Sequence, residues 1–157
     1  GEVARNVSQR AAAASGEGDP EKPQPSSSRM EGQKNITARG GTMSWGAYAC
    51  RLEKGSNAAK AYSSTEISER HRHRYEFNNQ YLDQIKASGL LPVGINPETG
   101  LVEIVELAKH PWFVGVQFHP ELKSTVENPH PLFVAFIKAC LKRQHRKEQV
   151  AMSSANN

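Results

Sequence analysis

The chain has 157 residues, of which 37% are hydrophobic and 23% are charged, with a formal net charge of +4 at pH 7. This length allows one domain with its own core, but a mean hydropathy of -0.64 predicts that part of the chain does not pack. No segment reaches the roughly 18 consecutive apolar residues of a membrane helix, and the N-terminal residues contain no apolar signal-peptide core. We therefore expect a cytoplasmic protein that does not enter a membrane.

The excess of positive charge is concentrated in two places, "RHRHR" at residues 70–74 and "KRQHRK" at residues 142–147. Neither is interleaved with an aromatic ladder or belongs to a recognisable nucleic-acid module, so the composition disfavours nucleic acid as the primary partner. The two cysteines, Cys50 and Cys140, have no metal-like spacing and form no disulfide framework, which fits a reducing compartment.

The first 29 residues are rich in Gly, Pro, Ser, Glu and Ala and contain almost no large apolar side chain. Such a segment cannot bury enough surface to offset its ordering entropy, so residues 1–29 are predicted to be a disordered lead-in. The next segment, "GGTMSWGAYACRL" at residues 40–52, predicts a strand interrupted at Gly46. A polar connection follows, with a short helix at its centre.

Residues 70–78 alternate in character. An extended conformation places His71, His73, Tyr75 and Phe77 on one side of a strand and the arginines on the other. A helix is predicted to follow through "QYLDQIKAS", capped by Asn78 or the next residue and stopped by a glycine.

Two apolar runs then flank "NPETG", a turn signal that predicts a β-hairpin, and the nearly continuous apolar run at residues 111–118 predicts a covered strand. The last element is a helix from about Asn128, with Pro131 in its first turn. Its apolar positions recur with helical spacing: Phe133, Phe136, Ile137, Cys140 and Leu141. Residues 149–157 are predicted to be a flexible tail.

A covered strand followed by a helix, with earlier strands and a helix before it, indicates an α/β layer architecture. Functional groups of open α/β sheets lie beyond the carboxyl ends of strands, which is where "FHPE" at residues 118–121 places His119 and Glu121. An imidazole exchanges a proton near neutral pH, and a carboxylate on its other nitrogen fixes the tautomer. Without further context, a polar end of a strand is the favoured interpretation of the same residues.

The context of the pair is more specific. "GVQFHPE" closely resembles the triad motif of class I glutamine amidotransferases. "ERHRHRYEFNN" and the flanking segments from about Met30 to Leu141 resemble the C-terminal half of the amidotransferase domain in the bacterial-type CTP synthase branch. The resemblance implies part of a flavodoxin-like fold, an open and mostly parallel sheet flanked by helices, over residues 30–148. It also implies an enzyme family that makes CTP from UTP with ATP, Mg²⁺ and ammonia from L-glutamine.

By this resemblance, His119 is the general base and acid of the glutaminase triad, Glu121 orients it, and Arg74 binds the glutamine carboxylate. A guanidinium fork can pair with both carboxylate oxygens, which supports the last assignment on chemical grounds. The spacing of His71 and His73 also suggests zinc, but flanking arginines would repel a dication and no Cys or carboxylate of the sequence completes the set. No metal or cofactor is therefore expected in this chain. ATP and Mg²⁺ belong to a synthase domain that is missing from it.

The chain departs from the family in lacking a nucleophile. The family's catalytic cysteine lies in a Gly-x-Cys-x-Gly turn, which does not occur here, and Cys50 and Cys140 fit packing or surface roles better. We therefore expect a fragment that is inactive alone, whose partners are the N-terminal part of the domain, the synthase domain and, at full length, further copies of itself. The alternatives are a non-catalytic half-domain that binds glutamine or a partner, and a basic interaction protein.

Overall fold

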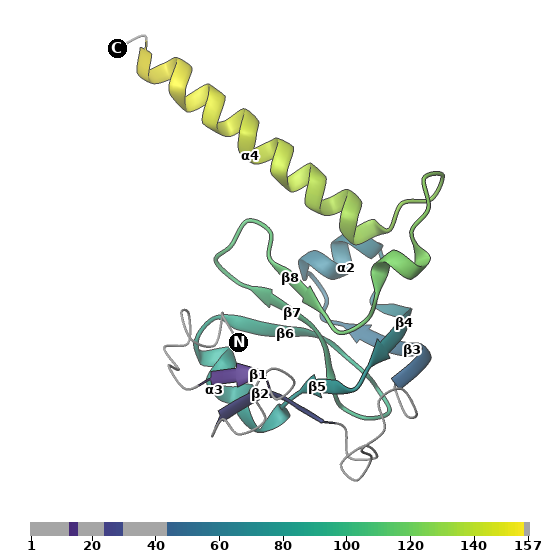
Figure 1. Ribbon diagram of the computed structural model, residues 1–157. Helices are drawn as coiled ribbons and strands as arrows, with labels where there is room; N and C mark the ends of the chain where they lie inside the picture. Colours follow the sequence, from purple (N-terminus) through teal and green to yellow (C-terminus); the bar gives the residue numbers. More distant parts are fainter. Residues whose placement is uncertain (1–12, 16–23, 30–43, 156–157) are drawn as a thin grey trace.

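The computed structural model describes residues 13–15, 24–29 and 44–155. The strands are β1 (Ala13–Ser15), β2 (Gln24–Arg29), β3 (Ser44–Leu52), β4 (Glu66–His73), β5 (Tyr75–Phe77), β6 (Leu90–Ile95), β7 (Val102–Leu107) and β8 (Val114–Val116). The helices are α2 (Asn57–Tyr62), α3 (Leu82–Ala87) and α4 (Pro131–Ala155), with 3₁₀ turns η2 (Asn79–Tyr81) and η3 (Pro120–Lys123). Strands and helices share one body, with α4 extending away from it (Figure 1).

The larger sheet has the strand order β4-β3-β6-β7-β8, and each neighbouring pair in it is antiparallel. Parallel pairing among the described strands is limited to β1 and β2, in the smaller sheet β1-β2-β5. The α/β class is confirmed, whereas the mostly parallel pairing expected from the family is not what these strands show. The connections from β6 to β7 and from β7 to β8 are short, and a tight hairpin can join only antiparallel strands.

The predicted hairpin is such a connection, and it is confirmed as β6 and β7. The Asn96 side chain accepts hydrogen bonds from the backbone N–H groups of Glu98 (2.9 Å) and Thr99 (3.2 Å), and Gly100 has a φ of 70°. Gly100 therefore has the positive φ that the turn signal predicted, and the Asn96 side chain stabilises the same turn.

The larger sheet curls on itself. Strands β3 and β6 share only two register pairs, Arg51 with Ile95 and Leu52 with Gly94. The chain leaving β8 then closes the sheet from the other side, because Gln117 N donates to the Glu103 carbonyl of β7 and His119 N donates to the Arg70 carbonyl of β4, both at 2.9 Å. We call this line of contact, residues 117–119 between β7 and β4, the seam.

The main core joins residues of the larger sheet to residues of α2 and the start of α4. It consists of buried small and apolar residues: Cys50, Leu52, Ala58, Ala59, Val93, Ile104, Phe118 and Leu132. A buried carboxylate joins α2 to the sheet, because Glu106 of β7 accepts hydrogen bonds from the Asn57 (3.1 Å) and Ala58 (2.7 Å) backbone N–H groups. Those donors have no partner inside the helix, so Glu106 satisfies the α2 N-terminus.

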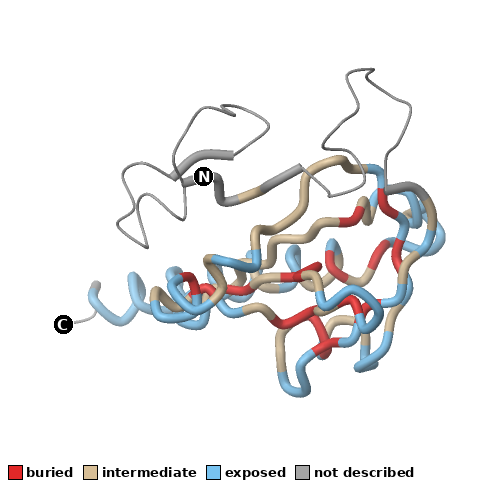
Figure 2. The backbone as a smooth tube through the Cα atoms, turned by 90° about the horizontal axis from the view of Figure 1, so that it is seen from below, coloured by how far each residue is buried: buried red, intermediate tan, exposed pale blue. Residues whose placement is uncertain are grey.

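Helix α4 begins at Pro131, a residue suited to the first turn, and its Leu132 is buried. From Cys140 to Ser154 every residue is exposed, and the predicted apolar face contains half-exposed side chains such as Phe136 (49%) and Ile137 (55%) (Figure 2). The segment from residue 149 to Ala155, predicted as part of a flexible tail, is a continuation of this helix. None of the described helices combines the length and apolarity needed to cross a bilayer.

Other expectations had mixed outcomes. The short central helix is confirmed as α2, and Asn78 caps η2 just before α3. Strand β8 is shorter than the run at 111–118 that predicted it. Strands β1 and β2 fall within residues 1–29, whose remaining residues, like residues 30–43, lie outside the described part of the chain.

Candidate functional site

The site begins where the chain leaves β8. His119 stands directly before η3, and its Nδ1 lies 2.7 Å from Oε1 of Glu121. Both side chains are open to solvent, at 39% exposed for His119 and 58% for Glu121. The hydrogen bond to His119 lowers the pKa of the Glu121 carboxyl, which therefore stays ionised at neutral pH. Sequence proximity and the 3₁₀ turn thus bring together the pair that the sequence singled out.

The seam fixes the backbone of this pair. Besides its backbone bond to β7, Gln117 donates its side-chain amide to the Tyr75 carbonyl of β5 at 2.7 Å. Phe118, which is 3% exposed, anchors the same segment in the core. His119 is therefore held by neighbours on both sides and by a buried residue directly before it.

A buried polar network supports the segment that follows. Glu69 of β4 is 2% exposed, and its Oε1 accepts hydrogen bonds from the Tyr62 hydroxyl (3.0 Å) and lies 3.1 Å from His130 Nε2. Lys123 of η3 donates to the Ser68 carbonyl at 2.7 Å and lies 3.6 Å from the same carboxylate. The network ties η3 and the start of α4 to β4.

Arg74, the predicted glutamine-binding residue, lies between β4 and β5 and is half-buried. It directly follows β4, the strand whose Arg70 carbonyl accepts the His119 N–H. The roles of Arg74 and His119 toward glutamine remain predictions.

Neither of the two cysteines has the environment of a catalytic thiol. Cys50 of β3 is 2% exposed, and burial, with the negative charges of Glu103 and Glu69, raises the pKa of its thiol to about 12. Cys140 lies exposed on α4. A buried thiol with a raised pKa is a poor nucleophile. Cys50 therefore fits the packing role that the sequence predicted.

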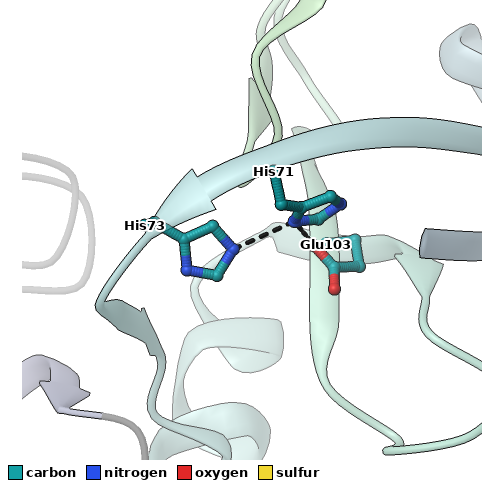
Figure 3. Close-up of side chains that lie close together, drawn as sticks. All are labelled: His71, His73 and Glu103. Atoms are coloured by element: carbon teal, nitrogen blue, oxygen red, sulfur yellow. Dashed lines mark hydrogen bonds and ion pairs between the residues drawn. The ribbon is translucent and has the colours of Figure 1, made fainter. Parts of the chain in front are cut away.

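A second cluster of titratable groups consists of His71, His73 and Glu103 (Figure 3). His71 Nδ1 is 2.9 Å from His73 Nε2 and 3.6 Å from Oε2 of Glu103, a buried residue of β7. Burial lowers the pKa of His71 to about 4, with the neighbouring His73 and His119 adding to the effect, and burial also lowers the pKa of His73. Burial raises the pKa of Glu103 to about 7, reinforced by the charge of Glu76.

The cluster corrects one premise drawn from the sequence, that no carboxylate completes the set formed by the two histidines. Glu103 does so because the curled sheet brings β7 against β4, although the two strands are not neighbours in the sheet. The sequence signal was a pair of acidic residues, Glu103 and Glu106, inside the apolar run of β7. Glu69 was missed as well, although it continues the alternation of His71 and His73 by one step.

The comparisons with known proteins agree with this geometry. The family model of class I glutamine amidotransferases matches residues 8–139. The chain belongs to the class I glutamine amidotransferase family.

Within that family, the chain is similar to CTP synthases. It is 60% identical to the CTP synthase of Cytophaga hutchinsonii over 88% of this chain and 26% of the relative. It is also 52% identical to that of Christiangramia forsetii over 97% of this chain and 28% of the relative. The chain therefore spans about a quarter of the length of these relatives.

Among solved structures, the Trypanosoma brucei CTPS glutaminase domain with bound acivicin matches with a TM-score of 0.82 and 35% identity, over 90% of this chain and 55% of that one. The resemblance recognised in the sequence is thus confirmed. Its extent is corrected, because the family match begins at residue 8 rather than near Met30. The boundaries of the predicted domain at residues 30–148 remain a prediction.

Proposed function

We propose that this chain supplies two parts of a CTP synthase glutaminase site: the groups that transfer protons and the residue that binds the carboxylate of glutamine. The observation that supports the proposal most directly is the 2.7 Å contact between His119 Nδ1 and the Glu121 carboxylate at the end of β8. An Nδ1–H that donates to this carboxylate leaves Nε2 as the nitrogen that accepts a proton. His119 would then deprotonate a cysteine thiol and later return the proton to the leaving ammonia.

Arg74 has a binding role in this proposal. Its guanidinium would pair with the glutamine carboxylate in both the ground state and the transition state. An interaction of that kind lowers KM without changing kcat. The position of Arg74 directly after β4, the strand that receives the His119 N–H, supports this assignment.

Neither Cys50 nor Cys140 fits the role of the nucleophile, so the chain alone should not hydrolyse glutamine. We further propose that the full-length protein converts UTP to CTP with ATP and Mg²⁺ on a separate synthase domain. It would assemble into homo-oligomers and be located in the cytoplasm. No residue of this chain is proposed to hold ATP or Mg²⁺.

The experiment combines this chain with the amino-terminal part of a relative's amidotransferase domain, in trans or as a fusion, and measures ammonia release from glutamine. We expect His119→Ala to reduce kcat by about 10²–10⁴-fold, the range for loss of a general acid–base group. Replacing the exposed His145 of α4 by alanine should have no effect. Restored activity that survives His119→Ala would refute the role given to this residue.

Two further variants separate orientation from binding. Glu121→Gln should lower kcat by less than His119→Ala, because the imidazole can still take a proton. The control Glu127→Gln, at another exposed position, should leave kcat unchanged. Arg74→Lys should raise the glutamine KM with little change in kcat, because an ammonium group cannot form the paired contact. A KM unchanged in Arg74→Lys would remove this residue from the binding site.

A second candidate function is binding without catalysis, which the absence of a suitable nucleophile favours. Calorimetry of the isolated chain with millimolar glutamine distinguishes the two readings. Binding that is lost in Arg74→Ala, together with no ammonia release after complementation, would support the binding module.

A further inference from the structure

Three potential metal-ligand atoms, from His71, His73 and Glu103, lie close together (Figure 3). The atoms are His71 Nδ1, His73 Nε2 and a Glu103 carboxylate oxygen, and they lie within 4.8 Å of one another. Tetrahedral zinc with bonds of about 2.0–2.1 Å needs ligand atoms roughly 3.3–3.4 Å apart. Two of the separations, 2.9 Å between the imidazoles and 3.6 Å between His71 and the carboxylate, lie on either side of that value.

We propose that His71, His73 and Glu103 form a binding site for a divalent transition-metal cation of the Zn²⁺ type. Two imidazole nitrogens and one carboxylate oxygen are a donor set that such borderline cations accept, leaving one position for water or another ligand. The proposal is independent of the glutaminase function proposed above.

Burial makes a metal-free carboxylate costly here. Glu103 is 6% exposed, and its Oε2 has no hydrogen-bond partner among the described residues. Glu76 and Asn96 are polar neighbours of this carboxyl. The His71 ring beside it packs against Tyr48 (5.2 Å between ring centroids) and Phe118 (5.9 Å). A cation held by the two histidines would compensate the buried negative charge.

A hydrogen bond between the two imidazoles is the alternative use of their close contact. It pairs one nitrogen of each ring but provides no bond to the carboxylate oxygen that faces them. The arginines that argued against a metal are less of an obstacle than the sequence suggested, because Arg70 and Arg72 are exposed and alternate with the histidines along β4. Their charges are screened by solvent.

The position of the site gives the metal a structural consequence. His71 and His73 belong to β4 and Glu103 to β7, two strands that are joined through the seam rather than by direct pairing. A bound ion would therefore cross-link the two halves of the curled sheet directly beside the segment that carries His119. The outer ring nitrogen of His71, Nε2, has no partner among the described residues, so we expect weaker binding than at fully supported zinc sites.

The first test is a titration of the full 157-residue chain with Zn²⁺ against a chromophoric chelator, followed by X-ray absorption on the loaded protein. We expect one Zn²⁺ per chain, with histidine scattering, nitrogen or oxygen ligands at about 2.0–2.1 Å and no sulfur. Zinc should also raise Tm in a concentration-dependent manner. The absence of stoichiometric binding, or sulfur in the first coordination shell, would overturn the proposal.

Variants identify the ligands. Glu103→Gln keeps the shape of the side chain and His73→Asn removes an imidazole, and each should weaken zinc binding by at least about tenfold. Matched controls are His145→Ala and Cys140→Ser, which remove exposed candidate ligands on α4 and should leave the affinity unchanged. Zinc binding that depends on the controls but not on Glu103 or His73 would place the metal elsewhere. Should a cluster variant fail to fold, the absorption spectrum of the unmodified protein decides.

Discussion

Replacing Glu69 by alanine tests whether its buried network holds the segment behind the candidate site. Its Oε1 is shared by the Tyr62 hydroxyl and His130 Nε2, which are also 3.1 Å from each other. After the substitution these two groups can pair together, so one buried donor rather than two loses its partner, at about 1–3 kcal/mol. Removing one methylene adds about 0.8 kcal/mol. We therefore expect a loss of about 2–4 kcal/mol in the free energy of unfolding.

Urea unfolding followed by circular dichroism measures the loss, and Glu66→Ala provides the control. Glu66 lies on the same strand but is exposed, so its replacement should cost no more than about 0.5 kcal/mol. Hydrogen exchange should accelerate in Glu69→Ala at the amides between Leu122 and His130, because Lys123 and His130 connect that segment to Glu69. Equal stability of the two variants would refute the argument that the network supports this segment.

Three other predictions concern the core, the thiols and the exposed dyad. Gly94→Ala would place a Cβ 2.6–2.9 Å from side-chain atoms of Ile104 and Cys50. It should therefore destabilise the chain by about 1–3 kcal/mol in the same urea assay. With a pKa of about 12, Cys50 is thiolate to the extent of roughly one part in 10⁴ at pH 8, so a thiol reagent should modify Cys140 in the folded chain and Cys50 only after unfolding. The lowered pKa of Glu121 means that its hydrogen bond is present above the ordinary Glu pKa of about 4.3 and is lost as the pH falls through the lower folded value. Carbon NMR of the Glu121 carboxyl, recorded as a function of pH, should show the lowered pKa. His119→Ala should raise this pKa.

The features that the sequence predicted are those determined by residues close together in the chain. The hairpin follows from an Asn-Pro and a Gly within five residues, and the His119–Glu121 contact follows from a spacing of two across a proline. The alternation that placed His71 and His73 on one face is also local, because it depends only on the pleat of a single strand.

Contacts between distant residues were not predictable in the same way. Glu69 meets His130 across 61 positions, and His71 meets Glu103 only because the sheet curls. A periodic pattern states which face of an element is to be covered, but it does not state by what. The apolar spacing along α4 was read correctly, yet Phe136 is half-exposed in this chain.

The seam connects these local and non-local features. His119 and Glu121 form their hydrogen bond across one intervening residue, so the dyad alone carries little information about where a substrate would lie. Its position relative to Arg74 depends instead on the His119 N–H bond to β4 and the Gln117 bonds to β5 and β7. A substitution that loosens the seam should therefore disturb the alignment of the dyad with Arg74 while leaving the dyad itself intact. In the completed enzyme, such a change would affect glutamine binding and turnover together, whereas loss of Arg74 alone would affect binding.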